Sequence, residues 1–232
     1  MRLALFSDVH GNWTALQEVW AAIQHCGSFD TIVCAGDLAG GRPHPSECVE
    51  FLAAHDVICI LGNTDTFFLG HPVPDSDARR RLPYLDAQIV WCSEHLSPAA
   101  HRFLQHLPMT YHVTPEPEAT ALICHATPSD LWPICPPDAP DSVWQATMGP
   151  TDAAVIAFGH VHAPAIRRID ATLYVNVAHC GLGAAEHVGF TILTYTNSGW
   201  QAERHRVAHD STAEQTYARR VGFPGADQDR GW

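Results

Sequence analysis

Lysine is absent from this sequence of 232 residues, and all 13 basic side chains are arginines. Without lysine the chain cannot form a Schiff base or use a Walker-type phosphate-binding lysine. The eight cysteines are scattered and include no Cys-x-x-Cys pair, so neither a disulfide framework nor a redox motif of that kind is indicated. Cys34, Cys59 and Cys124 fall in or beside expected core strands, where cysteine behaves as a small hydrophobe.

The sequence also lacks any apolar run of about 18 residues or more that could span a bilayer, and the first expected strand begins almost at Met1, with no signal peptide before it. We therefore predict a cytoplasmic protein with reduced thiols and no membrane partner. The formal net charge of -12 argues against bulk electrostatic binding of nucleic acid. An anionic substrate stays compatible with this charge, because bound divalent cations can reverse the local field.

Length and composition, with 46% hydrophobic and 16% charged residues, indicate one globular domain. We expect this domain to cover 1–222 and to be followed by a loosely ordered tail at 223–232. Two stretches, 66–97 and 127–142, are expected to be irregular excursions near the functional site. The first is expected to contain a short helix around 77–86, and the second is rich in prolines, which oppose regular structure.

Apolar, often β-branched runs alternate with segments of helical periodicity along the chain. They predict strands at 3–7, 31–34, 57–61, 109–113, 120–124, 153–158, 165–169, 173–177, 190–195 and 200–207. Helices are expected after a cap at Asn12 or Thr14, at 45–54, after a Ser97 cap and at 212–221. The order at the amino-terminal end, strand-helix-strand-helix-strand, is typical of parallel, right-handed connections.

Aspartate, asparagine and histidine follow directly after five of the expected strands. The five segments are Asp8-Val9-His10-Gly11-Asn12, Gly36-Asp37, Gly62-Asn63, His125 and Gly159-His160-Val161-His162. Ligands of open α/β sheets bind outside the carboxyl ends of the strands, so these side chains are expected to meet. Mixed oxygen and imidazole ligands suit Mn, Fe, Ni or Zn. So many candidate ligands exceed the needs of one ion and predict two divalent metals.

The ordered set resembles the calcineurin-like metallophosphoesterase superfamily, whose pattern is Asp-x-His, Gly-Asp, Gly-Asn, His and Gly-His-x-His. The resemblance covers 3–162, and the short chain is more similar to small prokaryotic phosphodiesterases than to large protein phosphatases. It implies an α/β fold, a four-layer sandwich of two mixed β-sheets flanked by helices. It also implies metal-dependent hydrolysis of phosphoesters by a hydroxide that bridges two metals and attacks phosphorus in line.

The resemblance assigns a ligand set to each metal and one bridging carboxylate, Asp37. The first set is Asp8, His10 and His162; the second is Asn63, His125 and His160. Asp37, Asn63, His125 and His160 form the implied catalytic group. If the backbone at 160–162 is extended, successive side chains point in opposite directions, and curvature at the strand end must bring the two imidazoles to neighbouring metals.

Thr64 departs from the superfamily pattern, because many members carry a histidine there as the proposed proton donor to the leaving group. A threonine hydroxyl is too weak an acid for that role. We therefore expect activated or diester substrates, or an acid from elsewhere such as His71. Asp65 is expected to orient the His10 imidazole or another group around the metals. Asn12 is interpreted as a helix cap in preference to a phosphate contact.

Ordinary structural interpretations are preferred for several other residues. The run Arg79–Arg81 reads as a solvated charge cluster, and Asn176 as part of a structural turn. Trp132 and Trp144 flank the proline-rich stretch, and packing is favoured over stacking on a base.

The predicted partner is a small phosphorylated substrate, a phosphodiester or nucleotide, and a homo-oligomer is left open. Two alternatives remain. One is a phosphomonoesterase or protein phosphatase using the same site, and the other is a non-catalytic scaffold with the same fold.

Overall fold

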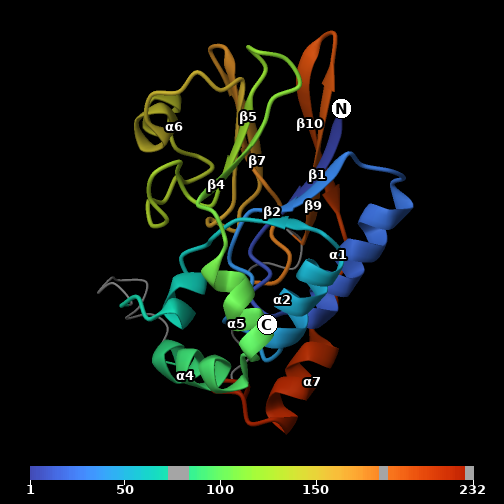
Figure 1. Cartoon of the computed structure of the whole chain (residues 1–232), viewed down its shortest axis with the longest axis vertical. Coiled ribbons are helices and arrows are strands. Elements are labelled where there is room, and N and C mark those ends of the chain that lie inside the picture. Colours follow the sequence, from blue (N-terminus) through green and yellow to red (C-terminus); the bar gives the residue numbers. More distant parts are fainter. Residues whose placement is uncertain (73–83, 183–187, 228–232) are drawn as a thin grey trace.

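The computed structural model describes residues 1–72, 84–182 and 188–227 (Figure 1). One sheet contains β1 (Arg2–Phe6), β2 (Thr31–Cys34), β3 (Ile58–Cys59), β9 (Gly189–Thr196) and β10 (Gly199–Arg206), in the order β10-β9-β1-β2-β3. The other contains β4 (Thr110–Val113), β5 (Ala121–Cys124), β6 (Val155–Phe158), β7 (Ala165–Ile169) and β8 (Thr172–Asn176), in the order β4-β5-β6-β8-β7. Both sheets are mixed, because β1, β2 and β3 are parallel, as are β5, β6 and β8, while the remaining pairs are antiparallel.

Alternate side chains of β1 serve two different parts of the core. Leu3 and Leu5 belong to a buried cluster that includes Ile123 of β5, so they fill the space between the sheets. Phe6 belongs instead to the cluster that includes the helix residue Leu16. The strand period of two residues therefore divides one short apolar run between a sheet–sheet interface and a sheet–helix interface.

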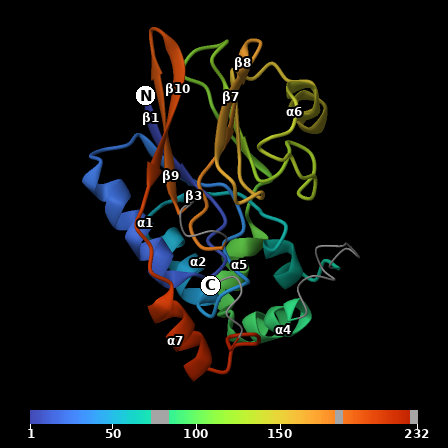
Figure 2. The same ribbon diagram turned by 180° about the vertical axis from the view of Figure 1, so that it is seen from behind.

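Helices cover both outer faces. The elements are α1 (Trp13–His25), α2 (Pro45–Ala54), α4 (Leu85–His95), α5 (Pro98–Gln105), α6 (Asp141–Met148), α7 (Thr212–Arg220) and the 3-10 helix η1 (Asp65–Leu69). α1 and α6 lie on opposite sides of the paired sheets in both views (Figures 1 and 2). Trp144 of α6 packs with Phe158 in the core cluster of the second sheet's outer face. The expected sandwich of two mixed sheets flanked by helices is confirmed.

Several expected local signals are also confirmed. β2, β7 and α2 have the predicted bounds. Asn12 caps α1, because its side chain accepts a hydrogen bond from the backbone N of Ala15. Ser97 caps α5 by accepting from Ala100, and Pro98 occupies the first helical turn. All eight cysteines are free, as expected. Among the described residues, no helix combines the length and hydrophobicity needed to cross a bilayer.

Three helical elements were not predicted. α4 occupies the second half of the stretch 66–97 that was expected to be irregular, and the leading residues 65–69 form η1. Leu85, Ile89 and Cys92 recur at helical spacing, and the Cys92 side chain is fully buried, which explains why α4 forms. α6 begins directly after Pro140, where the run of prolines ends. The expected helix around 77–86 lies largely in 73–83, outside the described residues, and so does Arg79–Arg81.

Two further expectations need correction. β3 contains two residues where five were predicted, because Leu61 leaves the ladder and its backbone N donates to the carbonyl of Pro108. The carboxyl-terminal segment was expected to be loosely ordered from 223, but Phe223 and Ala226 are buried against the helical layer. Their apolar side chains hold this part of the chain onto the helices. Residues 228–232 lie outside the described ranges.

Candidate metal centre

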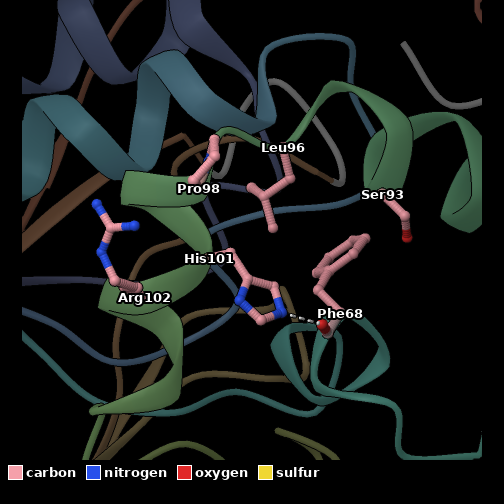
Figure 3. A pocket seen from close by; sticks show the side chains of 6 residues that line it. All are labelled: Phe68, Ser93, Leu96, Pro98, His101 and Arg102. Atoms are coloured by element: carbon pink, nitrogen blue, oxygen red, sulfur yellow. Dashed lines mark hydrogen bonds between the residues drawn. The ribbon is translucent and has the colours of Figure 1, made fainter.

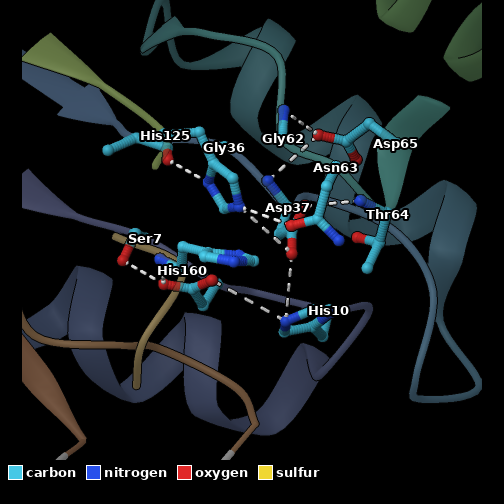
Figure 4. Close-up of polar contacts among 12 residues, drawn as sticks. Ser7, His10, Gly36, Asp37, Gly62, Asn63, Thr64, Asp65, His125 and His160 are labelled. Carbon is cyan, nitrogen blue, oxygen red and sulfur yellow. Dashed lines mark hydrogen bonds and ion pairs between the residues drawn. The ribbon is translucent and has the colours of Figure 1, made fainter. Parts of the chain in front are cut away.

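Carboxylates and imidazoles from both sheets meet beyond the carboxyl ends of the parallel strands (Figure 4). Asp37, which follows β2, lies at the centre: its Oδ2 is 3.5 Å from Nε2 of His10 and 3.5 Å from Nε2 of His125. Asp8, His10, Asp37 and His125 are at most 3% exposed. Buried carboxylates require charged or hydrogen-bonding partners, and within the described ranges the ion-pair partners of Asp8 and Asp37 are all histidines.

Two groups of three residues bring their ligand atoms within 4.8 Å of one another. One is Asp8, His10 and His162, the other is Asp8, Asp37 and His125. The first group has the same members as the first predicted ligand set. In the second group, Asp37 and His125 lie together as predicted, and Asp8 stands with them.

Asn63 and His160, the other members of the predicted second set, border this second group. Oδ1 of Asn63 lies 2.9 Å from Nε2 of His125. The His160 ring centroid is 5.1 Å from that of His125, and the backbone N of His160 donates to Oδ2 of Asp8 at 3.1 Å. Nε2 of His160 lies 3.3 Å from the carbonyl of Trp132, to which it can only donate. That hydrogen bond leaves Nδ1 as the nitrogen of His160 with a lone pair for a cation.

The backbone of the ligand segments is unusual. Five predicted ligands have φ between 50° and 68°, in the left-handed region: Asp8, His10, Asp37, His160 and His162. This region is unfavourable for residues with a Cβ and is retained where the surroundings impose it, often at functional sites. The extended backbone considered for 160–162 is therefore wrong. Two left-handed residues curl this segment into a turn, which is how both imidazoles face the same cluster.

Two glycines allow the ligand loops to approach each other. A Cβ at Gly36, whose φ is +93°, would lie 2.6 Å from Nδ1 of His125. A Cβ at Gly62 would lie 2.1 Å from both the backbone N and the Oδ1 of Asp37. Neither position can hold a side chain without displacing a candidate ligand.

Backbone carbonyls fix the orientation of two imidazoles. Nδ1 of His10 lies 3.0 Å from the carbonyl of Gly40, and Nδ1 of His125 lies 2.8 Å from that of Ala35. Carbonyls only accept, so Nδ1 carries the proton in each ring, and Nε2 is the ligand nitrogen of the neutral form. In both rings this Nε2 faces Asp37. Such carbonyl contacts are a common way to set the tautomer of a metal-binding histidine.

Charge and burial act together on the titration of the cluster. Burial would raise the pKa of the Asp8 and Asp37 carboxyls, but facing histidines, chiefly His162 and His125, hold both pKa values well below their usual range. Burial lowers the pKa of His125, yet the Asp37 carboxylate outweighs it and raises this pKa to about 9. For His10 burial dominates and lowers the pKa to about 4. The cluster therefore holds carboxylates in their ionised, ligand-competent form.

The Asp65 side chain binds backbone N–H groups, whereas the sequence suggested that it orients the His10 imidazole or another group around the metals. Its carboxylate accepts hydrogen bonds of 2.9–3.1 Å from the backbone N–H groups of Asp37, Leu38, Ala39 and Gly62. It thus ties the loop after β2 to the loop after β3. Burial, then the charge of Asp37, raise the pKa of Asp65 to about 7, while the N–H donors act in the opposite direction. Asp65 positions a candidate ligand through the backbone.

Hydrogen bonds to neighbouring loops occupy Thr64 and Asn12, so we assign neither residue a role in proton transfer or substrate binding. The backbone N of Thr64 donates to Oδ1 of Asp37 at 2.8 Å, and its hydroxyl donates to the carbonyl of Ala39 at 3.1 Å. Both amide atoms of Asn12 are engaged, since Oδ1 caps α1 and Nδ2 donates to the carbonyl of Gly181 at 2.9 Å. Both residues brace the loops around the cluster.

Several supporting contacts were not predicted. The Ser7 hydroxyl donates to Oδ2 of Asp8. Glu214 of α7 is 2% exposed and accepts from the backbone N of Thr14 at 3.3 Å and from the Thr14 hydroxyl. It thereby holds the first turn of α1, which follows directly on the Asp8–Asn12 loop. No local signal reveals a contact across 200 residues of sequence.

A separate hollow of about 440 Å³ lies between η1, the end of α4 and the start of α5 (Figure 3). It is lined by Phe68, Ser93, Leu96, Pro98, His101 and Arg102. None of these residues belongs to the predicted ligand set. His101 reaches across this hollow, with Nε2 donating to the carbonyl of Phe68 at 3.0 Å.

Comparison with known proteins identifies relatives in sequence and in fold. An uncharacterized protein of Methanocaldococcus jannaschii is 27% identical over 176 residues, which are 75% of this chain and 68% of that protein. A hypothetical protein of Pyrococcus horikoshii has a similar structure, with a TM-score of 0.80, 18% identity and coverage of 97% of this chain and 94% of that one. A metallophosphoesterase of Sphaerobacter thermophilus gives a TM-score of 0.73 at 21% identity, with 97% and 96% covered. At these identities the two structures show a shared fold.

The family model described as the calcineurin-like phosphoesterase superfamily domain matches residues 1–198. This range includes every predicted ligand and all the described strands except β10. The resemblance detected from the ordered ligand segments is thereby confirmed, and the chain belongs to the calcineurin-like phosphoesterase superfamily.

Proposed function

We propose that this protein is a dinuclear, metal-dependent phosphoesterase that hydrolyses small phosphodiesters or nucleotides. One observation carries the proposal: Oδ2 of Asp37 lies 3.5 Å from Nε2 of His10 and 3.5 Å from Nε2 of His125. A carboxylate between two imidazoles from opposite sheets is in the position to be shared by two cations. When bound, such a pair lowers the pKa of a shared water and polarises the phosphoryl group.

The residues around Asp37 fit two first-row divalent cations, Mn, Fe, Ni or Zn. We assign Asp8, His10 and His162 to one cation and His125, Asn63 and His160 to the other, with Asp8 near both groups of ligand atoms. The carbonyls of Gly40 and Ala35 hold His10 and His125 with Nε2 directed at the shared carboxylate. Asn63 adds an oxygen without negative charge, which keeps the centre electrophilic.

The surroundings of Thr64 support diester or activated substrates. Its hydroxyl already donates to the carbonyl of Ala39, and as an acid it is too weak to protonate an alkoxide near neutral pH. A leaving group that departs as a stable anion needs no such proton. Phosphodiesters with good leaving groups are therefore favoured over monoesters and phosphoproteins.

A comparison of matched substrates tests the proposal. With Mn added, we expect bis(p-nitrophenyl) phosphate to be hydrolysed faster than p-nitrophenyl phosphate, with about two ions bound per chain. Chelation should abolish both reactions, and Mn should restore them. Faster monoester hydrolysis would favour the phosphatase alternative. Metal that stays substoichiometric after reconstitution, together with no hydrolysis of any ester, would indicate the non-catalytic scaffold.

Metal affinity is expected to fall as the pH falls. Protons and cations compete for the same imidazole nitrogens, and the pKa of His125 is raised to about 9 by Asp37, after burial has acted to lower it. A cation that binds His125 near neutral pH must therefore displace a proton. Titrations with Mn between pH 6 and pH 9, followed by calorimetry in buffers of different ionisation enthalpy, should show tighter binding at high pH and proton release. Affinity independent of pH would contradict this ligand assignment.

A further inference from the structure

We infer that Trp132, backed by Phe67, forms an aromatic platform at the rim of the metal centre and stacks on a planar ring in the substrate's ester group. The ring can be an aryl group or a nucleobase, because stacking requires only a flat π-face. The inference rests on the proposed function, since it places this ring beside a phosphate held at the cluster. It narrows the substrate class to phosphoesters that carry an aromatic group.

Trp132 is fixed against a candidate ligand. Its carbonyl accepts from Nε2 of His160 at 3.3 Å, so the residue lies at the edge of the cluster. Its backbone N donates to Oδ1 of Asp130 at 3.0 Å. The same Asp130 closes a turn with Thr127, whose backbone N and hydroxyl donate to the Asp130 carbonyl at 3.0 and 2.9 Å. This turn begins two residues after His125. Trp132 is therefore anchored to the His125 segment through the turn and to His160 through its own carbonyl.

Phe67 reaches the same place from the first sheet. It belongs to η1, which follows the Asn63 loop, and its backbone N donates to the carbonyl of Thr64 at 3.1 Å. The Phe67 and Trp132 ring centroids are 6.0 Å apart, with 34° between the planes. Aromatic pairs in contact have centroids about 4.5–7 Å apart, so no third ring fits between them. Phe67 therefore supports one face of Trp132, and a ligand ring stacks on the exposed surface of the indole.

Trp132 and Trp144, which flank the proline-rich stretch, differ in burial. Trp144 is fully buried, and its Nε1 donates to the carbonyl of Pro136 at 3.1 Å, so packing accounts for it, as expected from the sequence. Trp132 is 37% exposed, and its neighbour Ile134 is 62% exposed. Large apolar side chains exposed together beside a polar cluster are informative, because they mark a surface that gains by being covered.

Binding of two phosphomonoesters tests the platform without relying on turnover. Thymidine 5′-monophosphate and methyl phosphate offer the same phosphate, and only the first carries a planar ring. We expect calorimetric titration of the Mn-loaded protein to show tighter binding of the thymidine compound. Trp132→Ala should reduce the ratio of the two affinities roughly 5- to 150-fold, the range for stacking one base. Trp132→Phe should keep most of the ratio.

Val143→Ala is the matched control, because Val143 of α6 is an exposed apolar residue, 40% accessible, and is not part of the aromatic pair. It should leave the ratio unchanged. A wild-type ratio in Trp132→Ala, with an unaltered circular dichroism spectrum, would overturn the platform while leaving hydrolysis and the proposed function intact. Wild-type protein that hydrolyses no phosphoester with any metal would instead remove the proposed function on which the platform depends.

Discussion

Asp37→Asn is expected to lower kcat/KM for bis(p-nitrophenyl) phosphate by at least about 1000-fold, which corresponds to about 4 kcal/mol of transition-state stabilisation. The substitution keeps the size of the side chain, and an amide oxygen can still accept from the backbone N of Thr64, as Oδ1 does now. What it removes is the negative charge at Oδ2, the atom that faces both His10 and His125. Metal content should fall with activity, because Asp8, which belongs to both groups, would be the one carboxylate left among the candidate ligands of these groups.

Asp138→Asn provides the matched control, since it makes the same chemical change at an exposed carboxylate of the proline-rich segment. It should alter neither metal content nor rate. The test requires folded protein, so the thermal unfolding of both variants is compared in the presence of chelator. An Asp37→Asn variant that keeps more than a tenth of the wild-type rate, with two ions bound, would show that Asp37 does not bridge.

The positions of the candidate ligands could be predicted because their placement follows from strand order. Asp8, Asp37 and His125 each come directly after an apolar run, and parallel strands deliver such residues to one edge of a sheet. These are local patterns with a geometric consequence, so one sequence suffices to read them.

The contacts that orient the ligands could not be predicted. The carbonyls of Ala35, Gly40 and Trp132 hold three imidazoles, but every residue carries a carbonyl, so no residue type signals this role. The left-handed backbone at His160 and His162 is equally hidden, because non-glycine residues enter that region only when their surroundings require it. Tertiary structure imposes both features.

Helix α4 shows a different limit of prediction from the sequence. Leu85, Ile89 and Cys92 already have helical spacing, but nearby prolines and a short apolar stripe favoured an irregular interpretation. Packing decides the outcome, because Cys92 is fully buried and Ile89 packs against the helical core cluster. Glu214 is a similar case, since its value as a support of α1 depends on where α7 docks.

Asp65→Ala should lower the free energy of unfolding by about 3–5 kcal/mol, since an unsatisfied buried donor costs about 1–3 kcal/mol and this carboxylate serves four N–H groups. One effect acts against this loss: burial and the charge of Asp37 raise the pKa of Asp65 to about 7, so its negative charge is unfavourable. Protonation can relieve that charge near neutral pH, whereas deletion of the carboxylate removes the acceptor that all four N–H groups share. The orphaned donors are therefore expected to dominate.

Denaturant and thermal unfolding at pH 7 with chelator measure this loss without a contribution from bound metal, and about 10 °C in Tm is expected for a chain of this size. Asp65→Asn separates the two effects. Its amide oxygen can serve Leu38 and Ala39, but its NH₂ would face the N–H groups of Asp37 and Gly62. If the missing acceptor dominates, the asparagine variant is destabilised, though less than the alanine variant. If relief of charge repulsion dominates, the asparagine variant is more stable than the wild type, and the loops that carry Asp37 and Asn63 must be held together by other contacts.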